Sequence, residues 1–196
     1  MKCVKLDGID LGFDLFPRRA EGVDPVRTEG VHLTDVIRSI MEESGMQKTV
    51  SGSFWRPDQL NMAGEVGFMW EDVLSTALKD RLPCRMGEVE LDGITCSPDG
   101  LEIDPDVQDD PILSEYKVVW ASSKRSPADN WKWMAQVKGY CKVLELTKVK
   151  MYILYLNGDW KGTGPQYKGF LIEFTQLEID ENWSMITNHA RSKKWI

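Results

Sequence analysis

Apolar residues recur at helical spacing in four segments of the chain. The first segment has Thr34 as a favourable N-cap residue and an apolar stripe that ends near Gly45. The last opens with Thr175-x-x-Glu178, a capping box in which each residue satisfies a backbone N–H group of the other. These patterns predict helices over about residues 34–45, 65–80, 129–145 and 175–196.

The segments around these helices carry the short apolar runs that are typical of strands. A turn at residues 97–100, Ser-Pro-Asp-Gly, separates the first two of them. Residues 1–30 show no sustained period and are expected to form an arm or an irregular edge, and residues 46–63 a loop. The predicted strands cover about residues 86–96, 101–103, 112–120, 149–156 and 169–174.

The order of these elements is helix, strand meander, helix, two strands and helix. It predicts an α/β fold with a small mixed β-sheet flanked by helices. The 196 residues are enough to bury a proper core, and no linker or internal repeat divides them. We therefore expect a single domain over residues 1–196, with residues 1–30 as an N-terminal arm and residues 175–196 as a C-terminal helix.

Composition is that of an ordinary globular protein, with 42% hydrophobic and 28% charged residues. No apolar run approaches the length of a membrane span, and the first residues lack the apolar stretch of a signal peptide. A cytoplasmic protein without membrane association is expected.

Cysteine and histidine positions argue against a zinc site. The two histidines, His32 and His189, are far apart, and no two cysteines form a C-x-x-C pair. Reduced thiols are expected for all four cysteines, and a site for a hard metal ion with oxygen ligands remains open. The cysteines are Cys3, Cys84, Cys96 and Cys141.

Charge is distributed unevenly along a chain whose net charge is −7. Residues 88–115 contain ten acidic side chains and no basic one, whereas residues 117–150 contain eight basic and two acidic side chains. An acidic block that collects cations next to a basic block that contacts phosphates suits a metal-dependent enzyme acting on nucleic acid. Two solvated faces of opposite sign are the alternative explanation.

Three residues in these blocks have the chemistry of phosphodiester hydrolysis. Asp99 stands at a strand start and Glu115 on the next predicted strand, so two carboxylates can reach one metal ion. Lys117 projects to the same face as Glu115, because side chains alternate along a strand. It can orient the attacking water or balance charge on the phosphate. The main-chain carbonyl of Tyr116 is well placed as a further ligand.

Asp99, Glu115 and Lys117 resemble the motif of the PD-(D/E)XK nuclease superfamily. Gly67-x-x-x-Glu71 and Gln136-x-x-x-Tyr140 are similar to motifs of the branch that contains RecB-like nuclease domains and phage lambda-type (YqaJ) exonucleases. The string Thr-Cys-Ser-Pro-Asp-Gly-Leu at residues 95–101 is especially close to the phage form. The resemblance covers residues 64–156, which it implies to be a catalytic core with a restriction-endonuclease-like fold.

The resemblance implies a divalent-metal-dependent deoxyribonuclease, most similar to an exonuclease that acts on DNA ends in phage-type recombination or DNA processing. Mg²⁺ would be the metal ion, with Mn²⁺ able to substitute. Asp99, Glu115, Tyr116 and Glu71 would form the metal site, with Lys117 as a catalytic residue. An iron–sulfur cluster of the kind found in some relatives is not expected, because no cysteine follows Cys141.

The predicted helix over residues 129–145 carries the expected DNA contacts. Gln136 and Tyr140 match the motif, and Lys132 extends their row at i, i+4, i+8 spacing, separate from the apolar stripe. The expected partner is DNA with free ends, and a homo-oligomer and a recombination partner protein are further possibilities for this chain. For a phage-encoded protein, the location would be the host cytoplasm.

Several alternatives stay open at this point. Asp92, in Leu-Asp-Gly-Ile at residues 91–94, competes with Asp99 for the role of first metal ligand, although Pro-Asp-Gly favours Asp99. The segment between Asp99 and Glu115 is also longer and more acidic than the phage enzymes usually show. A structure- or sequence-selective endonuclease of the same fold and a catalytically inactive DNA-binding module are the competing functions.

Overall fold

The computed structural model describes five stretches of the chain, residues 1–6, 28–46, 87–103, 111–162 and 164–196. It also describes five helical residues within the predicted 65–80 helix, namely Gly67, Met69, Trp70, Val73 and Thr76. Most of the predicted 46–63 loop and the rest of that helix, including Glu71, lie outside the described residues. The same holds for Cys84 and for residues 104–110 of the acidic segment.

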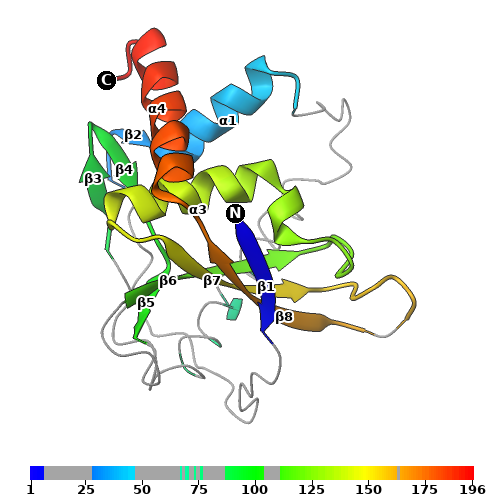
Figure 1. The fold of residues 1–196 in the computed structure, drawn as a ribbon. Coiled ribbons are helices and arrows are strands. Elements are labelled where there is room, and N and C mark those ends of the chain that lie inside the picture. The colour runs from blue at the N-terminus through cyan, green and yellow to red at the C-terminus, as the bar shows by residue number, and fades with distance from the viewer. Residues whose placement is uncertain are drawn as a thin grey trace.

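The main sheet has five strands in the order β1-β8-β7-β6-β5 (Figure 1). Only β6 and β7 are parallel, and the other neighbours are antiparallel, so the predicted mixed sheet is confirmed. The long crossover that a parallel pair requires is made by helix α3, Trp131–Val143. The strands are β1 Lys2–Leu6, β5 Gly100–Ile103, β6 Pro111–Val119, β7 Lys148–Tyr155 and β8 Gln166–Glu173.

Three helices lie on one side of this sheet, with α3 packed on its strands and the other two packed against α3 (Figure 1). They are α1, Leu33–Glu43, together with α3 and α4, Gln176–Ser192. The inward side chains of the central strands, such as Leu113 and Ile153, are fully buried against these helices in the main core cluster. On the opposite face, Trp70 packs in a smaller cluster with Tyr116 and Tyr152. Both faces of the sheet are therefore covered, as the α/β prediction requires.

A second, three-stranded sheet, in the order β2-β4-β3, lies beside α1. The prediction of one strand over residues 86–96 was wrong, because Asp92 and Gly93 turn the chain into a hairpin with φ angles of 52° and 75°. Asp-Gly favours such a turn, since both central residues need positive φ. The strands are β2 Val31–His32, β3 Val89–Leu91 and β4 Ile94–Cys96.

The N-terminal segment differs from its prediction as well. Residues 2–6 form the edge strand β1 in register with β8, where an arm or irregular edge was expected. Five residues are too few to display a period, and the strand gains its hydrogen bonds from a partner about 165 residues away in sequence. Helix α1 begins at Leu33 with His32 as N-cap, so Thr34 lies within its first turn. None of the helices in the described stretches is long and apolar enough to cross a membrane.

The predicted capping box of α4 is confirmed. The Glu178 N–H group donates to Thr175 Oγ1 at 3.2 Å, and the Thr175 N–H group donates to Glu178 Oε2 at 2.9 Å. The bond from the Thr175 N–H group and one from the N-terminal ammonium lower the pKa of Glu178 from 4.5 to about 2. Because the folded pKa is depressed, this stabilisation is present above about pH 4.5 and is lost as the pH falls toward 2.

We predict that Thr175→Ala lowers the free energy of unfolding by about 1 kcal/mol, because the N-cap oxygen is lost. Thr175→Ser, which keeps the oxygen, should stay close to the native value. Urea unfolding followed by circular dichroism measures both variants, and Glu178→Gln should flatten the pH dependence between about pH 4.5 and 2. Equal stability of the alanine and serine variants would show that the cap contributes nothing.

Candidate active site

The antiparallel pairing of β5 with β6 brings the two predicted metal ligands together. Gly100 pairs with Ser114, so the residue before the strand, Asp99, lies beside Glu115. The Tyr116 N–H group donates to Asp99 Oδ2 at 2.7 Å and holds that carboxylate against β6. The acidic segment that separates the two residues in the sequence therefore does not separate them in space.

Glu115 and Lys117 lie on the same face of β6, as strand alternation predicts. The Glu115 carboxylate is only 1% exposed, beneath α3, and the Lys117 ammonium donates to its Oε1 atom. Lys117 itself keeps 19% of its side chain exposed. A buried carboxylate needs such a partner, because burial without compensation costs several kcal/mol. The pair thus joins a buried acid to a cation that reaches solvent.

Helix α3 places Gln136 and Tyr140 over this pair. Gln136 Nε2 donates to the Tyr140 hydroxyl at 2.8 Å, and Tyr140 is 3% exposed within the core cluster. Burial raises the pKa of Tyr140 well above its ordinary value, and the nearby charges of Glu115 and Asp99 raise it further. One hydroxyl therefore senses both carboxylates. The sequence placed these two residues in contact with DNA, and that role stays a prediction.

Cys141, the next residue of α3, senses the same charge. Burial, with a smaller effect of the Glu115 carboxylate, raises the pKa of its thiol to about 12. It remains a free cysteine, as do Cys3 and Cys96. The environment above Glu115 is therefore dry and keeps neutral groups neutral at physiological pH.

A group of cations lies at the solvent side of the pair. Partial burial lowers the pKa of the Lys132 ammonium, and the charges of Lys117 and Arg38 lower it further. These residues come from α3, β6 and α1, so three elements converge at one positive region. Sequence reasoning missed Arg38, because an exposed arginine on the polar side of a helix is indistinguishable from a solvated charge. It forms an ion pair with Asp35 at 3.6 Å, within α1.

Asp92 has a different environment from Asp99. It occupies the turn between β3 and β4, and its Oδ2 atom accepts a hydrogen bond of 2.8 Å from the Trp183 indole of α4. The partner of Asp92 is thus on α4, whereas the partner of Asp99 is on β6, next to Glu115. The structure brings Asp99, and not Asp92, beside the Glu-x-Lys strand.

A second buried carboxylate, Glu102, lies on the other face of the sheet and is 0% exposed. It accepts hydrogen bonds from Lys150 Nζ at 2.6 Å and from the Tyr152 hydroxyl at 2.7 Å. These bonds connect β5 to β7 across β6, and so they fix the strand that follows Asp99. Sequence reasoning did not identify this network, although a lysine within the apolar run of β7 was a signal for it.

The described residues contain no cluster of three or more His, Cys, Asp or Glu side chains that could hold a metal ion. Asp99 and Glu115 supply two carboxylates, and the third acidic candidate, Glu71, lies outside the described residues. Mg²⁺ in enzymes is commonly held by one or two carboxylates and keeps several water ligands. The donor set present at this site therefore fits that ion.

Comparison with known proteins identifies the fold. No protein-family model and no curated protein matches the sequence. The crystal structure of SSO0001 is similar with a TM-score of 0.52 and 15% identity, over 87% of this chain and 78% of that chain. LHK-Exo in complex with dAMP is similar with a TM-score of 0.51 and 13% identity, over 84% of this chain and 88% of that chain. The similarity at this level of identity is one of fold.

The positive region predicts a measurable coupling between lysines. Lys117→Ala removes the nearest like charge and should raise the pKa of Lys132 toward its ordinary value, and Arg38→Gln should raise it by less. NMR titration of ¹³C-labelled lysine measures this pKa. Lys138→Gln is the control. Lys138 is also on α3, but its ammonium lies over the Phe174 ring, and the charges that lower the pKa of Lys132 are those of Lys117 and Arg38. An unchanged Lys132 pKa in both variants would contradict the described convergence.

Proposed function

We propose that this protein is a divalent-metal-dependent nuclease that hydrolyses phosphodiester bonds in DNA. The observation that carries the proposal is the placement of Asp99 beside Glu115, with the Lys117 ammonium on the Glu115 carboxylate. Its fold similarity to LHK-Exo, an exonuclease by name, supports the same activity. The environment of Asp92, which is bonded to Trp183, supports the choice of Asp99 as ligand.

Asp99, Glu115 and the Tyr116 carbonyl would hold Mg²⁺ or Mn²⁺, with Glu71 as the further ligand that the sequence motif implies. A bound Mg²⁺ ion supplies a water of lowered pKa and neutralises charge on the phosphate. Lys117 lies on the solvent-facing side of Glu115. From there it orients the attacking water and balances the negative charge that develops on the phosphate in the transition state. Gln136 and Tyr140, which the motif implies as DNA contacts, also keep the buried Glu115 carboxylate in a dry, fixed setting.

Lys132 and Arg38 bind the phosphates on either side of the reacting one. The charges of Lys117 and Arg38 lower the pKa of Lys132, so the three cations together produce a positive potential. The negatively charged phosphates of a DNA strand would be attracted to this potential. DNA is thus the partner that the charge of this region favours, although the net charge of the whole chain is −7.

We further propose that the enzyme is an exonuclease acting on DNA ends, as the motif resemblance to phage-type recombination enzymes implies. The name of LHK-Exo and the nucleotide dAMP in its structure support this proposal. We also propose that the enzyme acts in phage-type recombination, together with a recombination partner protein.

Removal of any member of the Asp99, Glu115 and Lys117 set should abolish cleavage. We predict that Lys117→Ala lowers the rate on the order of 10²–10⁴-fold, as is typical for loss of a group that acts in the transition state. Asp99→Ala and Glu115→Ala should lose activity together with metal affinity, which isothermal titration with Mn²⁺ measures.

Asp92→Ala is the matched control for these variants, because it removes an aspartate whose partner is on α4. It should retain metal affinity and cleavage after correction for any change in stability. Circular dichroism must verify folding, since Lys117→Ala leaves a buried carboxylate without its counter-ion. An active Asp99→Ala beside an inactive Asp92→Ala would reverse our choice of ligand.

Lys132→Ala should weaken binding to duplex DNA and lower the salt dependence by about 0.9 in the slope of log K against log salt concentration, which corresponds to one phosphate contact. Fluorescence anisotropy across a salt series measures this slope. Lys138→Ala, on the same helix, should leave it unchanged. The same slope for native protein and Lys132→Ala would remove Lys132 from the DNA-binding surface.

A further inference from the structure

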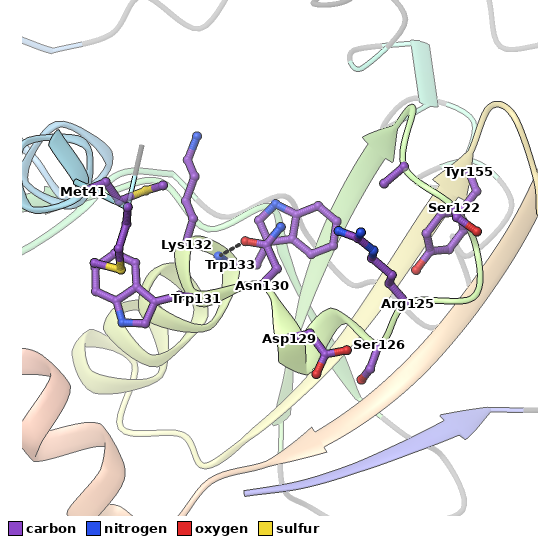
Figure 2. A pocket seen from close by; sticks show the side chains of 12 residues that line it. Met41, Ser122, Arg125, Ser126, Asp129, Asn130, Trp131, Lys132, Trp133 and Tyr155 are labelled. Atoms are coloured by element: carbon purple, nitrogen blue, oxygen red, sulfur yellow. Dashed lines mark hydrogen bonds between the residues drawn. The ribbon is translucent and has the colours of Figure 1, made fainter. Parts of the chain in front are cut away.

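A cavity of about 330 Å³ lies where the N-terminus of α3 meets the end of α1 and the loop after β6 (Figure 2). The motif comparison assigns no role to it. Its aromatic walls are Trp131, Trp133 and Tyr155, and its charged residues are the cations Arg125 and Lys132 and one carboxylate, Asp129. These side chains come from α3, from β7 and from the loop after β6 (Figure 2). The cavity therefore combines flat apolar surfaces with positive charge.

Tyr155, the last residue of β7, gives the cavity a polar group in need of a partner. Its side chain is 2% exposed, and its buried hydroxyl has no hydrogen-bond partner in the described part of the chain. Burial raises the pKa of this hydroxyl to about 12, so it stays protonated and can donate. Buried polar groups are nearly always satisfied, so this hydroxyl, on a residue that lines the cavity, is an exception among the described residues.

The two tryptophans are half-buried and pack against the main core. The main-chain N–H group of Trp133 donates to the capping side chain of Asn130 at 3.3 Å, which fixes the start of α3. An indole surface in a cavity with cations suits a nucleobase with its phosphate, since bases stack on aromatic side chains irrespective of sequence. Core packing alone would account for the indoles, but not for the Tyr155 hydroxyl or the cations beside them.

The cavity is adjacent to the candidate active site. Lys132 lines the cavity, and the charge of Lys117 lowers its pKa, so the two sites share this region of positive potential. The loop that lines the cavity follows β6 directly, four residues after Lys117. One DNA strand can therefore reach both sites.

We propose that this cavity receives an unpaired nucleotide of the DNA substrate. The inference rests on the proposed nuclease function and adds a preference for single-stranded or frayed ends. A volume of about 330 Å³ is near the lower limit for small-molecule sites and accommodates one nucleotide, not the end of a duplex. A base must leave the duplex stack before it can enter such a site.

The test measures binding without metal, so that it does not depend on cleavage. Fluorescence anisotropy in EDTA compares a labelled ten-residue thymidine oligonucleotide with an abasic oligonucleotide of equal length and with a blunt duplex. Trp133→Leu keeps an apolar side chain but removes the stacking surface, and Tyr155→Phe removes only the hydroxyl. Trp133→Phe is the conservative rescue, and Trp195→Leu, at the exposed end of the chain, is the tryptophan control.

Trp133→Leu should weaken thymidine binding on the order of tenfold and leave abasic and duplex binding unchanged. Tyr155→Phe should weaken thymidine binding about two- to tenfold, the usual worth of one hydrogen bond, without loss of thermal stability. Trp133→Phe should recover most of the affinity, and Trp195→Leu should match the native protein.

Unchanged thymidine binding in both cavity variants would overturn the inference, and so would an equal loss on the abasic oligonucleotide. Cleavage by native protein separates the two proposals. Metal-dependent cleavage with unchanged binding in the variants would refute the cavity and leave the nuclease. Selective loss of thymidine binding in a protein that cleaves no DNA would refute the nuclease and leave a nucleotide-binding cavity.

Discussion

The ion pair between Glu115 and Lys117 is the interaction on which the candidate site depends. A carboxylate that is 1% exposed would be strongly unfavourable in the core without a counter-charge, and Lys117 supplies that charge from the same face of β6. Replacement of both residues by apolar ones is often neutral or stabilising in other proteins. The pair therefore has its clearest rationale in chemistry, where a fixed acid and a solvent-reaching cation are needed together.

The surroundings of this pair keep it in one arrangement. Tyr140 and Cys141 of α3 cover the carboxylate, and burial, with a smaller effect of the Glu115 charge, raises the pKa values of both. On the other face of the sheet, Glu102 bonds to Lys150 and Tyr152 and joins β5 to β7. Asp99, at the start of β5, is thus positioned by the register of the sheet and by the Tyr116 N–H group.

Local patterns were enough to predict the parts of the fold that depend on short-range physics. The fold class, the capping box of α4 and the common face of Glu115 and Lys117 all follow from spacing along one element. The proximity of Asp99 to Glu115 was also predicted, because a turn and two adjacent strands leave few ways to pair. Their catalytic roles remain a proposal.

The features that sequence reasoning missed depend on contacts between distant segments. Arg38 approaches Lys132 only because α1 packs against α3. The edge strand β1 exists through its pairing with β8, and Glu102 is satisfied by residues almost fifty positions later. The hairpin at Asp92 was a different kind of error, because the local Asp-Gly signal was present and the longer apolar run outweighed it.

Cleavage of labelled DNA tests the central claim most directly. Purified protein is incubated with end-labelled linear duplex, linear single strand and circular DNA, each with and without Mg²⁺. The account predicts Mg²⁺-dependent release of nucleotides from linear DNA, with circular DNA left intact. Cleavage of the circle would identify an endonuclease on the same site. No cleavage of any substrate at any Mg²⁺ or Mn²⁺ concentration would contradict the assignment of Asp99, Glu115 and Lys117 as a nuclease centre.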